Sequence, residues 1–278
     1  MRPTFETLIQ QRWRLKCWDM SKAKRSKGFP ECYCLLMIDD LVIVIPARLD
    51  SNRLPNKPLI EFNGIPMIVR VAQKCAEVLD KRKIFVSTPD EQIITICKSH
   101  GINAVRSSTS ALSGTDRIVE FSKGNDYSRI INVQGDELLL TAECLENFIL
   151  ESRNNQNCTI GVMKISDQHE LTKASVVKVA ISENKLIYAS RSQIPNDTYA
   201  NEISAYKHTG LYMFTKDSLN QFSFQKQGYL EKTERIEILR FIENRIPVDV
   251  VEVNNYFFTI DTEDDVIAAK QLLERRNS

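Results

Sequence analysis

The sequence lacks the features that mark several large classes of protein. No apolar run approaches the roughly 18 to 20 residues that a helix needs to span a bilayer, so we expect no membrane insertion. The phosphate-binding pattern G-x-x-x-x-G-K and the dinucleotide-binding pattern G-x-G-x-x-G are both absent, which disfavours P-loop enzymes and dehydrogenases. The net charge of +1 lacks the excess of positive charge that is typical of nucleic-acid-binding proteins.

Paired cysteines are lacking too. The seven cysteines are an odd number without regular spacing, and several occupy apolar positions of expected helices. A disulfide framework is therefore not predicted, and a reducing compartment such as the cytoplasm is favoured. Cys32 and Cys34 are too close together to indicate a zinc site by themselves.

Positive charge is concentrated at the N-terminus. Residues 1–36 hold eight Lys or Arg and three Asp or Glu, and they contain no apolar segment of a secretory signal. We expect this segment to be a disordered extension or a start-site artefact, with a basic transit peptide as the alternative. Residues 37–278 would then form a single domain, because Met37 leads directly into an apolar strand pattern.

Strand and helix patterns alternate from Leu41 onward. The run Leu41–Ile45 is apolar throughout and rich in β-branched residues, which is typical of a strand buried on both faces. Further strands are expected over Ile84–Ser87, Asn103–Val105 and Arg129–Val133, with amphipathic helices between them. This order predicts a Rossmann-like α/β fold, a three-layer α/β/α arrangement with a mostly parallel mixed sheet.

The middle of the chain changes character. Several strand-like segments with short connections occur between about residues 156 and 215, and Ser182–Lys185 (SENK) has the composition of a hairpin turn. We expect an antiparallel insertion here that serves as a flap or an oligomer arm. After it, the pattern predicts one helix over Leu230–Ile242, a strand over Pro247–Val253 and a helix after Asp261.

A stiff basic loop follows the first strand. In Ile45–Leu59 (IPARLDSNRLPNKPL), three prolines alternate with Arg48, Arg53 and Lys57. Cations fixed on a rigid loop suit a polyphosphate, because each neutralises oxygens without a large ordering cost. A solvated surface loop is the alternative.

Two aspartates are expected at strand ends, where doubly wound sheets bind their ligands. Asp136 follows a strand and Gly135, and Asp261 follows a later strand-like segment. Mg²⁺ usually takes one or two carboxylates and shares its other positions with phosphates and water. Each aspartate alone is equally well explained as a helix cap. Together with a phosphate-binding loop, a shared Mg²⁺ becomes the better explanation.

Seven segments match one enzyme family in order and at similar spacing: VIVIPARLDSNRLPNKPL, FNGIPMI, SGTDR, INVQGDE, YASRSQIP, HTGLY and IDTEDD. From about Leu41 to the end, the chain thus resembles the cytidylyltransferases that activate 3-deoxy-manno-octulosonate (Kdo), a sugar of bacterial lipopolysaccharide. The resemblance implies a nucleotidyltransferase that joins CMP from CTP to the anomeric hydroxyl of a 3-deoxy-2-ulosonic acid and releases pyrophosphate. It also implies Mg²⁺, a cytoplasmic homodimer, and a role of the part at about 156–215 in dimerisation and sugar binding.

The same resemblance implies roles for individual residues. Arg48 and Lys57 would hold the triphosphate, and Asp136 would act in catalysis and share the metal with Asp261. The substrate-binding set would be Ser113, Arg117 and Gln134 for cytosine and ribose, and Arg53, Arg191, His208, Tyr212 and Glu237 for the sugar. An arginine would pair with the sugar carboxylate. His208 by itself is also explained as a packed strand histidine.

Three positions depart from the family pattern. Leu138 stands where proline is usual, Leu112 where histidine is frequent, and Ile238 where a sugar-contacting glutamine is usual. Loss of that amide predicts a changed preference for the hydroxyl pattern, so a modified sugar such as 8-amino-Kdo stays open. A synthetase of the CMP-sialic-acid type and a non-catalytic sugar-nucleotide-binding protein are the alternative functions.

Overall fold

Strand β1 (Leu41–Pro46) lies inside the sheet, and all six of its residues are buried. The computed structural model describes residues 40–50, 54–196, 205–254 and 259–277. β1 pairs in parallel with β4 (Ile84–Thr88) and β6 (Arg129–Val133), and β5 (Asn103–Arg106) extends the sheet beyond β4. Strands that are covered on both faces need apolar side chains on both, which explains the continuous apolar run of β1.

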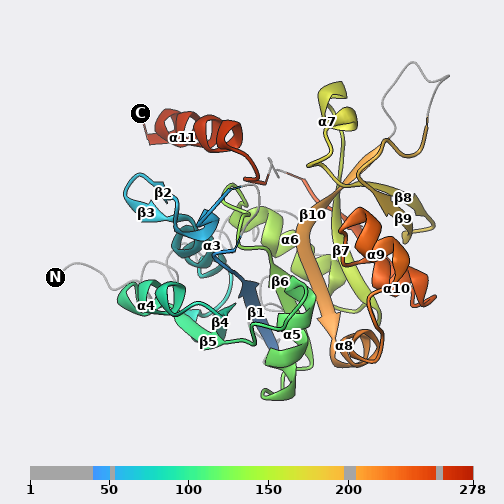
Figure 1. Ribbon diagram of the computed structural model, residues 1–278, viewed down its shortest axis with the longest axis horizontal. Helices are drawn as coiled ribbons and strands as arrows, with labels where there is room; N and C mark the ends of the chain where they lie inside the picture. Colours follow the sequence, from blue (N-terminus) through green and yellow to red (C-terminus); the bar gives the residue numbers. More distant parts are fainter. Residues whose placement is uncertain (1–39, 51–53, 197–204, 255–258, 278) are drawn as a thin grey trace, which may run out of the picture. The chain divides into compact units, whose positions relative to one another are not determined.

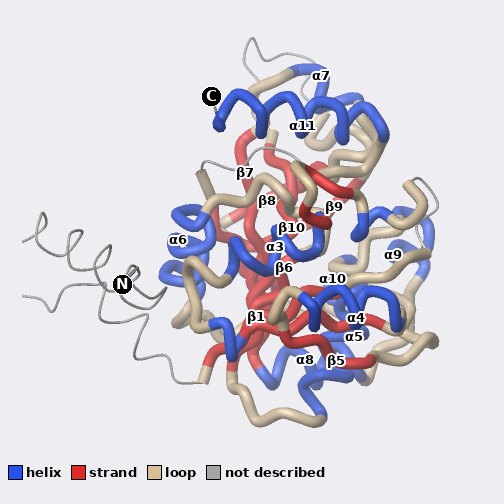
Figure 2. The backbone as a smooth tube through the Cα atoms, turned by 90° about the vertical axis from the view of Figure 1, so that its left-hand side faces the viewer, coloured by secondary structure: helices blue, strands red, loops and turns tan. Residues whose placement is uncertain are grey.

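Helices cover both faces of this sheet, which confirms the three-layer α/β/α prediction (Figures 1 and 2). The main helices are α3 (Met67–Cys75), α4 (Glu91–Ser99), α5 (Gly114–Lys123), α6 (Ala142–Ser152), α8 (Lys216–Ser223) and α10 (Leu239–Glu243). Val42 and Val44 of β1 pack in one cluster with residues of α5, α8 and α10. α3, which contacts both α4 and α6, lies on the other face.

Strand β10 (Tyr206–Thr215) joins the parallel part of the sheet to the predicted antiparallel insertion. Its C-terminal half pairs antiparallel with β6, and its N-terminal end pairs antiparallel with β8 (Lys178–Ser182). β7 (Cys158–Lys164) pairs antiparallel with β10 over Tyr206–Met213. β8 forms a hairpin with β9 (Lys185–Ser190) through the expected SENK turn. One pairing departs from the antiparallel prediction, because β7 runs parallel to β11 (Val248–Glu252). The strand order is β5-β4-β1-β6-β10-β7-β11-β9-β8.

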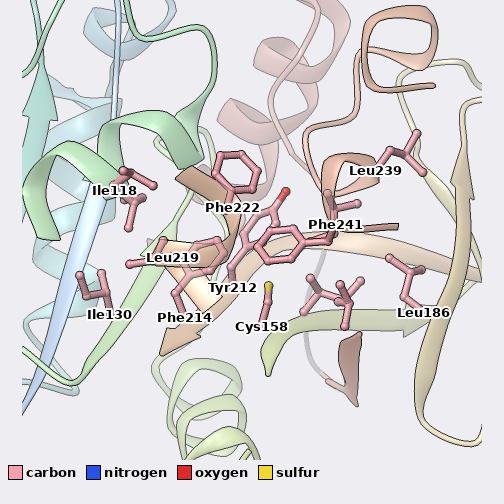
Figure 3. Packing of buried hydrophobic residues seen from close by; sticks show 14 of the residues in the cluster. Ile118, Ile130, Cys158, Leu186, Tyr212, Phe214, Leu219, Phe222, Leu239 and Phe241 are labelled. Atoms are coloured by element: carbon pink, nitrogen blue, oxygen red, sulfur yellow. The ribbon is translucent and has the colours of Figure 1, made fainter. Parts of the chain in front are cut away.

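An aromatic column anchors β10 to the helices (Figure 3). The rings of Tyr212 and Phe214 stack with centroids 5.7 Å apart, and Phe214 stacks on Phe241 of α10 at 6.3 Å. Phe222 of α8 lies 5.1 Å from Phe241. These residues belong to the cluster around Ile118 and Ile130. The column therefore fixes β10, which borders the cleft described below, and α10, which directly follows cleft residues.

The single helix predicted over Leu230–Ile242 is wrong. The structure has α9 (Tyr229–Glu234) and α10, separated by Arg235 in the left-handed conformation (φ 55°, ψ 46°). The end of α9 is held from outside, because Arg191 Nε donates to the Glu234 carbonyl at 2.9 Å and Nη2 to the Arg235 carbonyl at 3.3 Å. Such partners satisfy carbonyls that a continuing helix would have bonded.

The remaining elements are short, apart from the last helix. They are η1 (Lys57–Leu59), β2 (Glu61–Phe62), β3 (Ile65–Pro66), η2 (Lys81–Lys83), α7 (Gln168–Thr172) and α11 (Glu263–Asn277). Residues 41–278 form one compact unit. The extension predicted over residues 1–36 lies outside the described residues, so the boundary at residue 37 stays a prediction. None of the helices in the described ranges is long and apolar enough to cross a membrane.

Candidate active site

A cleft opens at the carboxyl ends of β1 and β6, where doubly wound sheets place their ligands. It consists of two cavities of about 930 Å³ and about 780 Å³. The residues that line both include Arg48, Ser113, Gln134, Asp136, Arg191 and Asp261. Residues of α7 and α11, both at the top of Figure 1, line the larger cavity. The two cavities are therefore halves of one site.

Three residues that are far apart in the sequence meet at the junction of these halves. Lys57 Nζ lies 2.5 Å from Asp136 Oδ2 and 2.9 Å from Asp261 Oδ1. Burial by itself would lower the pKa of Lys57, but the two carboxylates outweigh it, and its pKa is raised. Lys57 is therefore a charged bridge between the two aspartates that were predicted to share a metal.

One backbone and one side-chain hydrogen bond hold the segments of the two aspartates together. Ile260 N donates to the carbonyl of Asp136 at 3.4 Å. Beside it, Thr259 Oγ1 donates to Oε1 of the buried Glu137 at 3.3 Å. The loop after β6 and the segment before α11 are thus tied side by side.

Neither aspartate acts as a helix cap. In α11 the Thr262 hydroxyl accepts from the N–H of Asp265 at 3.2 Å, and the Asp265 carboxylate accepts from Asp261 N and Thr262 N, both at 2.9 Å. The helix after Asp136, α6, is capped by the Thr141 side chain. Threonines therefore cap both helices, whereas the carboxylates of Asp136 and Asp261 both contact the Lys57 ammonium.

The smaller cavity is the cationic half of the cleft. Arg117 is 4% exposed, and its Nη1 donates to the Ser113 carbonyl at 3.0 Å. Its Nε has no hydrogen-bond partner among the described residues. Burial, and then the nearby Arg48, lower the pKa of Arg117. Two neighbouring guanidinium groups with spare donors suit an anionic ligand.

The other half is the larger cavity, and polar side chains line it. Glu237 accepts from Thr115 N at 3.0 Å and from Gln134 Nε2 at 3.3 Å, and burial raises its pKa. Burial, and then the Glu237 carboxylate, raise the pKa of Tyr212. His208 packs edge-on to Tyr212 with ring centroids 4.8 Å apart.

His208 is neutral at physiological pH. Burial lowers its pKa to about 3, and its buried Nε2 has no partner within the described part of the chain. A buried polar atom without a partner calls for an explanation, and a ligand hydroxyl would supply the missing hydrogen bond.

All predicted site residues that the structure describes line this cleft. Arg53 lies outside the described residues. Arg191 is in the cleft, but Nε binds the Glu234 carbonyl and Nη1 binds the Ala174 carbonyl at 2.8 Å. Its position shows a role in shaping the wall, so its pairing with a ligand carboxylate stays a prediction.

Ile238 corrects one expectation. Its side chain is 1% exposed and packs in the hydrophobic cluster, whereas Ile236 and Glu237 line the cleft. The expected contact of position 238 with a sugar is therefore wrong, and the apolar residue is explained by its buried environment. Leu112, by contrast, lines the cleft and is exposed, so this departure does lie at the site.

The sequence patterns missed several residues of the site. Lys207 lines the cleft and forms an ion pair with Glu170 of α7. Behind the cavity lining, Arg240 of α10 supports the site: its Nε lies 2.7 Å from Glu231 Oε2, and its Nη1 lies 2.9 Å from Asp116 Oδ1. These contacts tie α10 to both α9 and α5. No local pattern reveals the pairs of Lys207 with Glu170 and of Arg240 with Asp116, because their partners are distant in sequence.

Comparison with known proteins assigns the chain to a family. Residues 42–250 match the family described as cytidylyltransferase. This chain belongs to the cytidylyltransferase family. As a cytidylyltransferase it is a nucleotidyltransferase enzyme, and the resemblance seen in the sequence motifs is confirmed.

Similar cytidylyltransferases share one description. The 3-deoxy-manno-octulosonate cytidylyltransferase of Chloroherpeton thalassium is 36% identical over 241 residues, covering 84% of this chain and 98% of that protein. The protein of the same description from Acinetobacter baumannii is 38% identical, covering 76% and 90%. A solved CMP:2-keto-3-deoxy-manno-octonic acid synthetase complexed with CTP has a TM-score of 0.77 and 30% identity, covering 86% of this chain and all of the other.

The donor set of the cleft fits a divalent metal, which cytidylyltransferases generally use. The carboxylates of Asp136 and Asp261 converge on one cation, the Lys57 ammonium. The described residues contain no group of three or more His, Cys, Asp or Glu suited to a metal. Two carboxylates beside an open cleft suit an ion that takes its other ligands from phosphates and water.

Proposed function

We propose that the protein transfers CMP from CTP to the anomeric hydroxyl of Kdo and releases pyrophosphate. The observation that carries this proposal is the meeting of two carboxylates, Asp136 after β6 and Asp261 before α11, at Lys57, between a cationic half and a polar half of one cleft. The similarity to a synthetase complexed with CTP supports the nucleotide, and the similarity to two Kdo cytidylyltransferases supports the sugar.

In this proposal the cationic half binds the nucleotide. Arg48 and Lys57 hold the triphosphate, and Ser113, Arg117 and Gln134 orient the cytosine and ribose. Phosphoryl transfer of this kind needs no protein nucleophile, because positioning and charge stabilisation lower the barrier. Asp136 and Asp261 would hold Mg²⁺. The chemistry that bound Mg²⁺ supplies is charge neutralisation and a lower pKa for the attacking hydroxyl.

The polar half orients the sugar. The Nε2 atom of neutral His208 can form a hydrogen bond with a sugar hydroxyl, and Tyr212 and Glu237 present further polar groups beside it. Arg191 lines the cleft and is assigned in this proposal to the sugar carboxylate. The fixed positions of β10 and α10 keep this set in place.

The test is pyrophosphate release from CTP and Mg²⁺ with Kdo, 8-amino-Kdo, a sialic acid or no sugar. Since Ile238 lies in the core, we expect Kdo to be the preferred substrate. Asp136→Asn should reduce the rate with Kdo by at least about 100-fold, in line with loss of a charge-stabilising group. Release only with the sialic acid would point to the other synthetase class. No release with any sugar would contradict the proposed reaction.

The proposal extends to the setting of the reaction. The product would serve lipopolysaccharide synthesis, and the cytoplasm supplies CTP. The four described cysteines, Cys75, Cys97, Cys144 and Cys158, are buried free thiols, which suits a reducing compartment. The homodimer that the resemblance implies is also part of this proposal. Light scattering of the purified protein tests the dimer.

A further inference from the structure

Lys57 is engaged in a way that the proposed reaction does not explain. Its ammonium lines the cleft but directs two of its three donors at Asp136 and Asp261, the carboxylates that the proposed reaction assigns to the metal. A metal bound to both carboxylates would take this place, so Lys57 then needs a second position in the reaction cycle.

We propose that Lys57 is an internal cation that holds the metal carboxylates together when no metal is bound, and that a divalent metal binds only by displacing it toward the nucleotide. This inference rests on the proposed function, since it assumes that Asp136 and Asp261 hold the metal.

The carboxylates need a cation at all times. Both bind the same nitrogen, and their side chains are only 22% and 14% exposed. The bond from Ile260 N to the Asp136 carbonyl keeps the two segments adjacent, so the carboxylates cannot separate to relieve repulsion. Like charges held this close in a shielded site disfavour the ionised state unless a positive charge lies between them.

The metal and the ammonium compete for one place. Mg²⁺ binds oxygens at about 2.0 to 2.1 Å, so an ion bound to both carboxylates would occupy the region that now holds Nζ. Two cations cannot share it. Lys57 has a flexible four-carbon stem and lines the same cavity as Arg48 and Arg117, so the released ammonium can reach an anionic ligand there.

This exchange couples metal binding to nucleotide binding. Without nucleotide, the displaced Lys57 has no phosphate to bind. The binding free energy of the metal must then offset the loss of both ion pairs of Lys57. If the bridge is formed for about 90% of the time or more, the apparent metal affinity falls at least about tenfold. The nucleotide removes this penalty by offering Lys57 another partner.

The experiment measures Mg²⁺ binding without nucleotide. Nucleotide-free protein is treated with EDTA, dialysed, and titrated with MgCl₂ while the melting temperature is recorded, with NaCl of equal ionic strength as a parallel series. In K57M the metal-free melting temperature should be lower than in wild type, and the half-saturating Mg²⁺ concentration should be at least about tenfold lower. The K57M/D261N double variant should lose this response.

A second Lys57 variant and a control at a distant ion pair complete the experiment. K57Q is neutral but can still donate hydrogen bonds, and it should bind Mg²⁺ more tightly than wild type even if K57M does not fold. K185M removes the ion pair between Lys185 and Asp249, away from the cleft, and should respond to Mg²⁺ as wild type does.

An unchanged half-saturating Mg²⁺ concentration in both Lys57 variants would overturn the inference. The titration uses neither CTP nor sugar. A protein that shows the exchange but releases no pyrophosphate in the substrate panel would therefore refute the proposed reaction and leave the metal exchange standing.

Discussion

Gly210 offers a direct test of how the site is held together. An added Cβ at this position would lie 2.1 Å from Glu137 Oε1, 2.7 Å from Cδ and 2.8 Å from Cγ. Glu137 is 1% exposed and accepts from Thr259 Oγ1, so its side chain has little room to move. Gly210→Ala must therefore push Glu137 out of its place.

The expected cost follows from this overlap. Overpacking of a buried position typically costs about 1 to 3 kcal/mol. For a domain of this size, that corresponds to a fall in melting temperature of about 2 to 12 °C. Because Glu137 ties the Asp136 loop to the segment of Asp261, its displacement should also move the carboxylates. A misplacement of about 1 Å can reduce a rate about 100-fold, so we expect a rate loss of 10- to 100-fold.

The assay compares thermal unfolding and pyrophosphate release in two alanine variants. The control is Gly124→Ala, where the nearest heavy atom to an added Cβ is the Phe121 carbonyl oxygen at 4.0 Å. This variant should keep the wild-type rate. The double variant G210A/E137D shortens the obstructing side chain and should recover part of the lost stability. A G210A protein with wild-type melting temperature and rate would refute the reasoning.

Two more predictions concern buried ionisable groups. Arg240→Met leaves Glu231, which is 3% exposed, without its cation, so the free energy of unfolding in urea titrations should fall by about 3 to 5 kcal/mol. The control, Arg82→Met, removes an exposed pair with Asp80 and should change the free energy of unfolding by less than about 1 kcal/mol. Equal losses in both variants would contradict the buried-pair argument. The pKa of His208 in the folded protein, about 3, lies below its ordinary value of 6.5. As the pH falls, the unfolded chain therefore binds a proton at this histidine before the folded chain does. The stability that His208 contributes is present above pH 6.5 and is lost as the pH falls toward 3. Wild type should therefore lose more unfolding free energy than H208Q between pH 7.5 and pH 5.0, and parallel losses would contradict a histidine that stays neutral in the folded protein.

Local patterns were sufficient for much of the fold. The apolar run of β1 and the alternation of strands and helices predicted the parallel sheet, because strands buried on both faces leave a continuous apolar signal. The SENK turn was predicted from its composition, and Glu183 and Asn184 do have positive φ values, of 50° and 57°. Such features depend on neighbouring residues, so the sequence contains them.

The break between α9 and α10 had no local signal. Residues 230–242 have a helical pattern, but Arg191 binds the carbonyls at the end of α9 from a distant strand end. This break brings Glu237 to the cleft and leaves Ile238 in the core. A periodic pattern cannot predict an interruption whose cause lies about 40 residues away.

The sequence by itself determined which chemical groups the site would contain: the carboxylates of Asp136 and Asp261, the basic loop after β1 and the polar side chains of β10. Asp136 and the basic loop directly follow strands, so their place at one edge of the sheet could be inferred. Asp261 was expected after a strand, but the structure places it just before α11. Only the tertiary structure decided how those groups engage each other. The bridge from Lys57 to both aspartates joins residues separated by 79 and 204 positions, and contacts over such separations are made by packing and leave no trace in local sequence.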